Sequence, residues 1–175
     1  MAESVVELTW NAIINGFEQI STLNSIGGVA FRNTVKAVHK RMFIDSPPTE
    51  FPCISVYPIS EEYSTDDTNK SVIHIDCIFA VVGYVSSNSD RGENEQSSLS
   101  IDSMSLKHDM FRVVSDMALK YVNGGTLEGT ITVPRFILNK SIKMTNVADF
   151  GSNNIGAFDF RLPVRIQWYA GDLLA

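Results

Sequence analysis

The chain has 175 residues, of which 44% are hydrophobic and 19% charged, and its formal net charge is -6. These proportions are typical of a folded globular protein and exclude a fibrous repeat or a largely disordered chain. The negative charge argues against a general nucleic-acid binder, because affinity for phosphate backbones comes chiefly from clustered lysine and arginine. A chain of this length suits one core of ordinary size, so we expect a single domain spanning residues 1–175.

The first residues lead straight into an amphipathic stretch and lack the basic and apolar regions of a secretory signal. No apolar run approaches the roughly 18 residues that a membrane-spanning helix needs. We therefore expect a protein that is made and kept in a cytosol and has no membrane partner.

Two cysteines, Cys53 and Cys77, are too few for a disulfide framework and lack the spacing of a zinc site. If the strands that carry them pair as argued below, Cys53 lies opposite about Ala80, which is ~10 Å along the strand from Cys77. That distance exceeds the reach of a disulfide. We expect two buried free thiols that pack as small apolar side chains.

Residues 3–21 carry apolar side chains three and four positions apart, the spacing of a helix with one buried face. The members of this stripe are Val5, Leu8, Ala12, Ile13, Phe17 and Ile20. The pair Gly27-Gly28 then predicts a turn. Residues 29–44 are rich in β-branched and aromatic side chains, so we expect a strand with a bulge after Ala37, ended by two prolines.

The segments 51–59 and 71–85 are expected to form an antiparallel hairpin around the polar residues 65–69. Both faces of the second segment are apolar, because Ile78, Ala80 and Val82 alternate with a first apolar set. This strand should therefore be central, with helices or another subunit covering its second face.

Residues 86–98 contain no large apolar side chain and are expected to form an exposed, mobile loop. Residues 99–121 have helical apolar spacing and end at a Gly-Gly pair. Strands are then predicted at 129–138, 141–147 and 155–169, the last with a possible shift of phase at Pro163.

The predicted order of elements is α, β, β, β, α, β, β, β. It indicates an α+β fold with a mainly antiparallel sheet of about six strands and two helices packed on one face.

The sequence contains neither a phosphate-binding glycine loop nor a catalytic serine elbow. Its histidines, His39, His74 and His108, fall on three different elements. His74 and Asp76 share a strand face and could touch, although a solvated ion pair explains them as well. The acidic clusters lack the glycine and terminal glutamate of a calcium loop. We therefore expect no catalytic residue, no metal and no cofactor, and predict that the chain is not an enzyme.

One basic run stands out in an acidic chain: Arg32, Lys36, His39, Lys40 and Arg41. Charge of this kind can protect an exposed sheet edge from aggregation. It can also form a docking surface for an acidic partner, including an acidic patch on a neighbouring copy. Both interpretations stay open at this point, and the five residues are the candidate interface.

Several segments carry a family resemblance in their order and short motifs: the opening amphipathic helix, the basic first strand, Phe51-Pro52 before CISVYPI, the partner strand SVIHIDCIFAVVGYV, the helix SLKHDMFRVVSDMAL and the closing strand FDFRLPVRIQW. Together they resemble the tail terminator and tail-completion proteins of tailed bacteriophages. The likeness covers most of the chain, and no motif in it fixes the family's contact residues here.

The resemblance implies a structural virion protein that forms a ring, usually of six subunits. Such a hexameric ring caps the head-proximal end of the tail tube, stops its polymerisation and offers a joining surface to the head connector. Its partners would be other copies, the tail tube protein and a head-side connector or completion protein, with DNA passing through the lumen without specific binding. The expected location is the tail or neck of the virion, after assembly in the host cytoplasm.

Two alternatives belong to other classes. The first is a different phage neck or tail component, such as a head-tail connector or a tube-like subunit. The second is a small enzyme with an unrecognised site. Closed oligomers of one size would favour the ring, and uncontrolled filaments would favour a tube protein.

Overall fold

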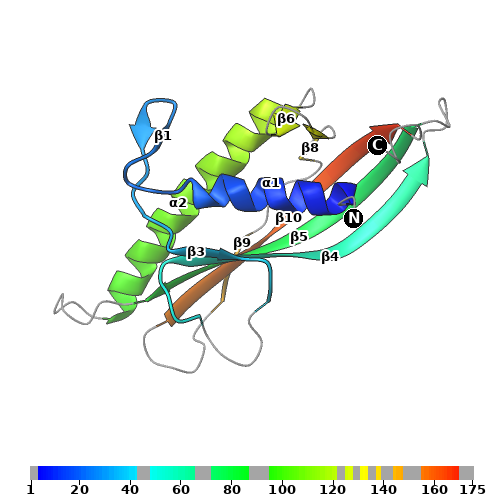
Figure 1. Ribbon diagram of the computed structural model, residues 1–175. Coiled ribbons are helices and arrows are strands. Elements are labelled where there is room, and N and C mark those ends of the chain that lie inside the picture. The colour runs from blue at the N-terminus through cyan, green and yellow to red at the C-terminus, as the bar shows by residue number, and fades with distance from the viewer. Residues whose placement is uncertain are drawn as a thin grey trace.

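The computed structural model describes the chain in these ranges: 4–42, 48–65, 72–86, 95–121, 125–127, 131–133, 137–138, 144–147 and 155–169. Two helices, α1 (Val5–Glu18) and α2 (Glu95–Tyr121), pack against one six-stranded sheet (Figure 1). The predicted α+β fold, with a mainly antiparallel sheet and two helices on one face, is therefore confirmed. A single domain over residues 1–175 stays a prediction.

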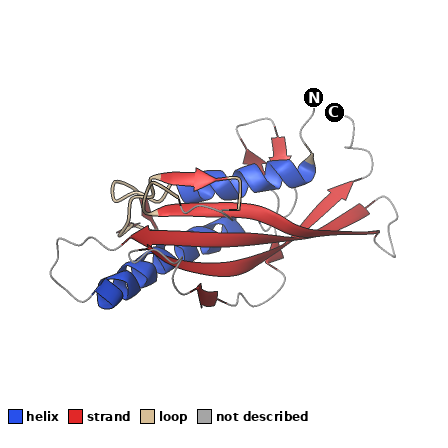
Figure 2. Cartoon of the chain, turned by 90° about the horizontal axis from the view of Figure 1, so that it is seen from below, coloured by secondary structure: helices blue, strands red, loops and turns tan. Residues whose placement is uncertain are grey.

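The sheet has the strand order β3-β4-β5-β10-β8, and β9 also pairs with β10. The bounds of these strands are β3 Ala37–His39, β4 Cys53–Thr65, β5 Val72–Ser86, β8 Ile137–Leu138, β9 Met144–Val147 and β10 Ile155–Tyr169. All neighbours are antiparallel except β3 and β4, which run parallel. The three long strands β4, β5 and β10 run side by side through the molecule (Figure 2).

Helix α1 begins at the cap residue Ser4, whose hydroxyl accepts a hydrogen bond from the Glu7 amide at 3.2 Å. The predicted apolar stripe is its buried face, and Ile13 and Phe17 are completely buried. Helix α2 supplies the other half of the helical layer. Its buried residues are Leu106, Asp109, Met110, Val113, Val114 and Met117. Both helices therefore cover the same apolar face of β4, β5 and β10.

The packing between β5 and β10 requires a glycine at position 83. The ring of Phe158 lies directly over Gly83, and a Cβ there would stand 2.3 Å from the ring. Phe158 is itself completely buried. Any larger residue at position 83 would displace this ring, so the close approach of the two strands depends on the glycine.

The predicted strand over residues 29–44 is wrong. Residues Val29–Ala30 form β2, which pairs only with β1 (Ser25–Ile26) in a small separate hairpin, and three residues form β3. Two glycines with positive φ, Gly27 at 60° and Gly28 at 77°, make the hairpin turn. Between β2 and β3 the Arg32 and Asn33 amides bind the Asp109 side chain instead of a neighbouring strand.

The predicted pairing of β4 with β5 is confirmed, but its register is not the expected one. Cys53 lies opposite Tyr84, not Ala80, and Cys77 lies opposite Glu61. Both cysteines are free and buried, as predicted. The pairing also extends to Thr65, whereas the predicted strand ended at residue 59. This end of the strand is solvent-exposed, so its polar side chains keep their contact with water and incur no desolvation penalty.

Strand β10 keeps one phase along its whole length, so no shift occurs at Pro163. Phe158, Phe160, Leu162 and Val164 are all buried on the helix side. Pro163 lies between the stretches of β10 that pair with β9 and β8, and neither pairing includes it. A residue without an N–H is tolerated where no ladder bond is needed.

The remaining boundaries differ from those expected. Helix α2 begins at Glu95, so residues 95–98 are helical where a loop was predicted. Residues 87–94, the rest of that predicted loop, lie outside the described residues. Strands β6 (Gly125–Leu127) and β7 (Ile131–Val133) form a separate two-stranded hairpin. Of the helices in the described ranges, none is long and apolar enough to cross a membrane.

Candidate assembly surface

The predicted basic run lies mostly along one edge of the sheet, because β3 is an outermost strand. We call Lys36–Arg41 the basic segment. Its backbone is held to the fold by the Lys36 amide, which donates to the Pro52 carbonyl at 2.8 Å. A second anchor is the Arg41 carbonyl, which accepts a hydrogen bond from the Ser55 hydroxyl. The side chains of Lys36, Lys40 and Arg41 are exposed, so the segment presents positive charge to solvent.

Lys40 leans toward the helical layer. Its ammonium nitrogen lies 5.4 Å from the centre of the Trp10 ring on α1, in a cation–π contact. The Trp10 indole N–H in turn donates to the Val56 carbonyl on β4 at 3.0 Å. Lys40 therefore has a structural contact as well as an exposed charge.

His39 adds little positive charge at neutral pH. Burial lowers its imidazole pKa, the nearby Arg41 guanidinium lowers it further, and Glu50 partly opposes these effects. A pKa below the usual value of 6.5 leaves the ring neutral at pH 7. The charge of the basic segment thus comes from Lys36, Lys40 and Arg41.

Arg32 is separated from the other four candidates. Its amide donates to Asp109 Oδ2 at 2.9 Å, which places this part of the chain against α2. The structure therefore brings Lys36, His39, Lys40 and Arg41 together on the edge and places Arg32 before them, beside the other helix. Four of the five candidate residues therefore lie on or beside an outer strand of the sheet, and the interface itself stays a prediction.

The carboxylate of Asp109 is completely buried and organises the loop before β3. Its Oδ2 atom accepts hydrogen bonds from the Arg32 amide, the Asn33 amide and the Asn33 side-chain amide at 2.8–2.9 Å. Its Oδ1 atom lies 3.6 Å from an Arg112 nitrogen. This residue was missed from sequence. The available signal was an aspartate on the apolar face of a helix, between Leu106 and Val113.

Arg112 ties the β1–β2 hairpin to α2. Its guanidinium donates to the carbonyls of Ile26 and Ala30 at 3.0 Å each and to that of Val29. It also lies 4.8 Å from the centre of the Phe31 ring. One side chain therefore satisfies several hairpin carbonyls and carries the charge that faces Asp109.

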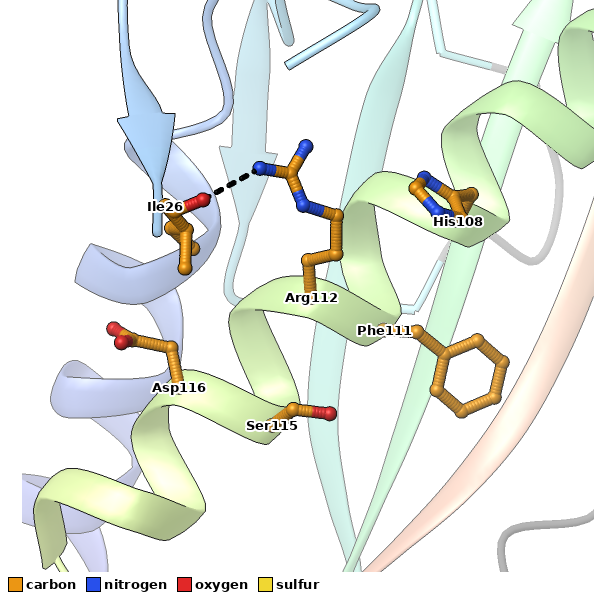
Figure 3. Close-up of a pocket in the computed structure, with 6 residues that line it drawn as sticks. All are labelled: Ile26, His108, Phe111, Arg112, Ser115 and Asp116. Atoms are coloured by element: carbon orange, nitrogen blue, oxygen red, sulfur yellow. Dashed lines mark hydrogen bonds between the residues drawn. The ribbon is translucent and has the colours of Figure 1, made fainter. Parts of the chain in front are cut away.

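A depression of about 320 Å³ lies between α2 and β1. It is lined by Ile26, His108, Phe111, Arg112, Ser115 and Asp116. Its imidazole, hydroxyl and carboxylate point in different directions and do not converge (Figure 3). Nucleophilic catalysis needs a nucleophile and a base within hydrogen-bond reach of each other. The residues that line the depression do not form such a pair, so the depression does not support the hypothesis of an enzyme.

The far end of β4 is exposed on the same edge as the basic segment. We call Ser60–Thr65 the acidic end of β4; it follows a bulge between Pro58 and Ser60. Within the described residues, β4 pairs on its β3 side only at Cys53–Ser55. Every side chain of the acidic end is exposed, and Tyr63, at 62%, donates its hydroxyl hydrogen to Glu61 Oε2 at 2.9 Å. This bond raises the Tyr63 pKa.

The second face of the sheet is only partly covered. At one end the buried residues Cys53, Val82, Tyr84 and Ala157 form a small cluster with Phe51, Tyr57 and Ala37. Further along, Ile78 is 37% exposed. The chain itself thus closes one end of this face, and the helices cover the opposite face.

Asp76, half of the predicted His74–Asp76 pair, forms an ion pair with a residue on β10. Arg165 donates from Nε to Asp76 Oδ1 and from Nη2 to Oδ2, both at 2.7 Å. This two-point bond raises the Arg165 pKa. Both groups are about one-third exposed, so the pair fixes geometry more than it adds stability.

The two thiols have the properties of core residues. Burial raises the pKa of Cys53 and of Cys77 to about 12, and neighbouring carboxylates add to the effect. At neutral pH both remain protonated, and a protonated thiol is neither a good nucleophile nor a metal ligand. Among the residues that the structure describes, no three histidine, cysteine or acidic side chains are grouped to hold a metal ion.

No protein-family model matches the chain, and comparison with curated proteins finds no match. A function can therefore be inferred only from the surface described above and from the motifs of the sequence.

Proposed function

We propose that the chain is a ring-forming structural subunit that acts as the terminator of a phage tail. In this role a ring of copies, expected to number six, caps the head-proximal end of the tail tube, stops the addition of tube subunits and provides the surface to which the head connector joins. DNA passes through its lumen.

The observation that carries the proposal is the exposed acidic end of β4. Tyr63 within it is 62% exposed and Ile59, just before it, is 42% exposed, on an edge without a described neighbouring strand. Exposed large apolar side chains beside an open sheet edge are typical of protein contact sites. A surface of this kind supports self-assembly, and the sequence motifs direct the proposal to the terminator family.

The charge of the molecule is compatible with a ring that surrounds DNA. A net charge of -6 repels a phosphate backbone, so DNA can pass without being held. The engaged carboxylate of Asp76 and the protonated thiols of Cys53 and Cys77 offer little to the competing hypothesis of a small enzyme.

Electron microscopy and mass measurement of the purified protein test this function. We expect closed rings of one stoichiometry that bind one end of isolated tail tubes and block their further growth. A protein that stays monomeric at micromolar concentration and does not bind tubes would contradict the proposal, and open filaments would indicate a tube subunit instead.

A further inference from the structure

We infer that the acidic end of β4 in one copy docks against the basic segment of a second copy. The inference rests on the proposed self-assembly and adds the surfaces through which it occurs. Its occupant is a second copy of this chain, identified by the complementary charge that the chain itself carries.

The charges are segregated along the sequence. Residues 29–41 contain four lysines and arginines and no acidic residue, whereas residues 42–69 contain six acidic residues and no lysine or arginine. Random placement of 14 basic and 20 acidic residues would mix the two signs more evenly. The chain thus provides two adjoining segments of opposite charge.

The fold places Lys36, Lys40 and Arg41 on the same edge as Glu61 and Glu62, but the two groups lie far apart along it. The Arg41 carbonyl accepts a hydrogen bond from Ser55, and Glu61 follows six positions further along β4. At about 3.3 Å per residue, the separation is ~20 Å. The screening length in physiological salt is about 8 Å, so the two groups barely interact within one copy. A neighbouring copy can bring them into contact.

Acidic and basic side chains of this edge point to both faces of the sheet. Glu61 lies opposite the helix-facing residue Cys77, and Glu62 lies opposite Asp76, so their carboxylates point to opposite faces. Lys40 of the basic segment leans toward the helical layer, over Trp10. Arg41 lies near the second-face residue His39, whose pKa it lowers. A docked copy can therefore meet opposite charge on either face.

Backbone pairing is a poor alternative explanation of the contact. Pro58 has no N–H to offer, and the bulge that follows it interrupts the regular edge. Both features discourage the addition of another strand. Charge of either sign would protect the edge from aggregation equally well. Protection alone therefore does not explain why the basic and acidic residues are separated into two segments. Side-chain charge is therefore the feature that selects the partner.

A charge-exchange experiment tests the contact. One variant carries Lys36→Glu and Arg41→Glu, and the other carries Glu61→Lys and Glu62→Lys. Each variant alone should assemble at least about tenfold more weakly than the parent, because like charges then meet. An equimolar mixture of the two should assemble again through contacts between unlike variants. A chain with all four substitutions should also assemble.

The control for Glu61→Lys with Glu62→Lys is Glu7→Lys with Glu18→Lys, which makes the same change of net charge on the exposed face of α1. It should assemble like the parent. Circular dichroism and thermal melting establish that each variant is folded, which is expected because substitutions of exposed charges change stability little.

The outcomes separate this contact from the proposed ring. Rings that form equally well in every variant would overturn the contact and leave the terminator function standing. Loss of assembly in both variants without rescue in the mixture would show that the two segments do not meet each other, and would also overturn the contact. Because the basic segment and the acidic end of β4 lie on one edge, two copies related by a two-fold axis can form the contact twice and stop at a dimer. If the mixture of variants restores only a dimer, the contact is supported and the ring is rejected. A monomeric parent would overturn both.

Discussion

Asp109 is a charged side chain in the core, and the free-energy cost of burying it is offset by the hydrogen bonds and the ion pair around it. Three N–H groups converge on Oδ2, and the Arg112 guanidinium faces Oδ1. A buried carboxylate without such partners would be strongly destabilising. The residue therefore replaces the ladder bonds that residues 32 and 33 would make in a strand.

Replacing this carboxylate should destabilise the fold. We expect Asp109→Ala to lower the free energy of unfolding by about 3 kcal/mol, because buried amides lose their acceptor. Asp109→Asn keeps one acceptor oxygen and should cost roughly half as much. Asp102→Ala, on the same helix but only half-buried, is the matched control and should change stability by less than about 0.5 kcal/mol. Urea titrations measure all three; equal losses at positions 102 and 109 would refute the role assigned to Asp109.

The thiols lead to a pH dependence. Their pKa values are raised from 9.0 in the reference state to about 12 in the fold, so the unfolded chain loses these protons first. The stabilisation from keeping them protonated is complete below pH 9 and is lost as the pH rises toward 12. The free energy of unfolding should fall over that interval. The fall should be smaller for Cys53→Ala with Cys77→Ala, and an unchanged slope in that variant would contradict the prediction.

At the level of elements, sequence patterns predicted best where one physical effect dominated. Apolar spacing located α1, and the alternation in residues 71–85 identified the central strand, because burial decides both. The segment 29–44 failed because its β-branched residues favour a strand while its backbone donors bind Asp109, which lies 77 positions from Arg32. Short-range propensity contains no information about such a partner.

The candidate site was predicted only in part for a similar reason. Composition identified the basic residues Lys36–Arg41, and their place on an outer strand agrees with the edge interpretation. The acidic end of β4 was left outside the predicted strand, which ended at residue 59, because exposed strand residues need no apolar pattern and resemble a loop in sequence. The hairpin of β1 and β2 was not anticipated, since its main support comes from Arg112 on α2.

That support predicts a local effect. In Arg112→Ala, the carbonyls of Ile26, Val29 and Ala30 lose their shared donor, so amide exchange in residues 25–30 should accelerate at least about tenfold. The core strands should keep their protection apart from a small general loss. Arg32→Ala, an exposed arginine in the adjoining loop, serves as the control and should leave the hairpin unchanged. Equal exchange in both variants would mean that the hairpin does not depend on Arg112.

On the scale of the whole molecule, the two faces and the two edges of the sheet have different roles. The helices and their core occupy one face, and the small cluster around Tyr84 closes one end of the other. The short strands β8 and β9 pair along β10 at one side of the sheet. The other edge carries the basic segment and the acidic end of β4, and it is the edge that we propose for assembly.

If that edge is the contact, its apolar side chains should contribute independently of its charges. We expect Ile59→Ser with Tyr63→Ser to weaken assembly at least about tenfold, since burying two such side chains is worth roughly 1.5–3 kcal/mol each. Apolar contacts are not screened by salt, so the loss should persist at high ionic strength, where the charge variants approach the parent. Leu23→Ser removes a side chain that is 94% exposed beyond the end of α1, and this control should assemble normally. Assembly of the double variant should therefore be measured against this control across a salt series. If the loss of assembly disappears at high salt, the whole contact is due to charge, and this part of β4 makes no apolar contribution.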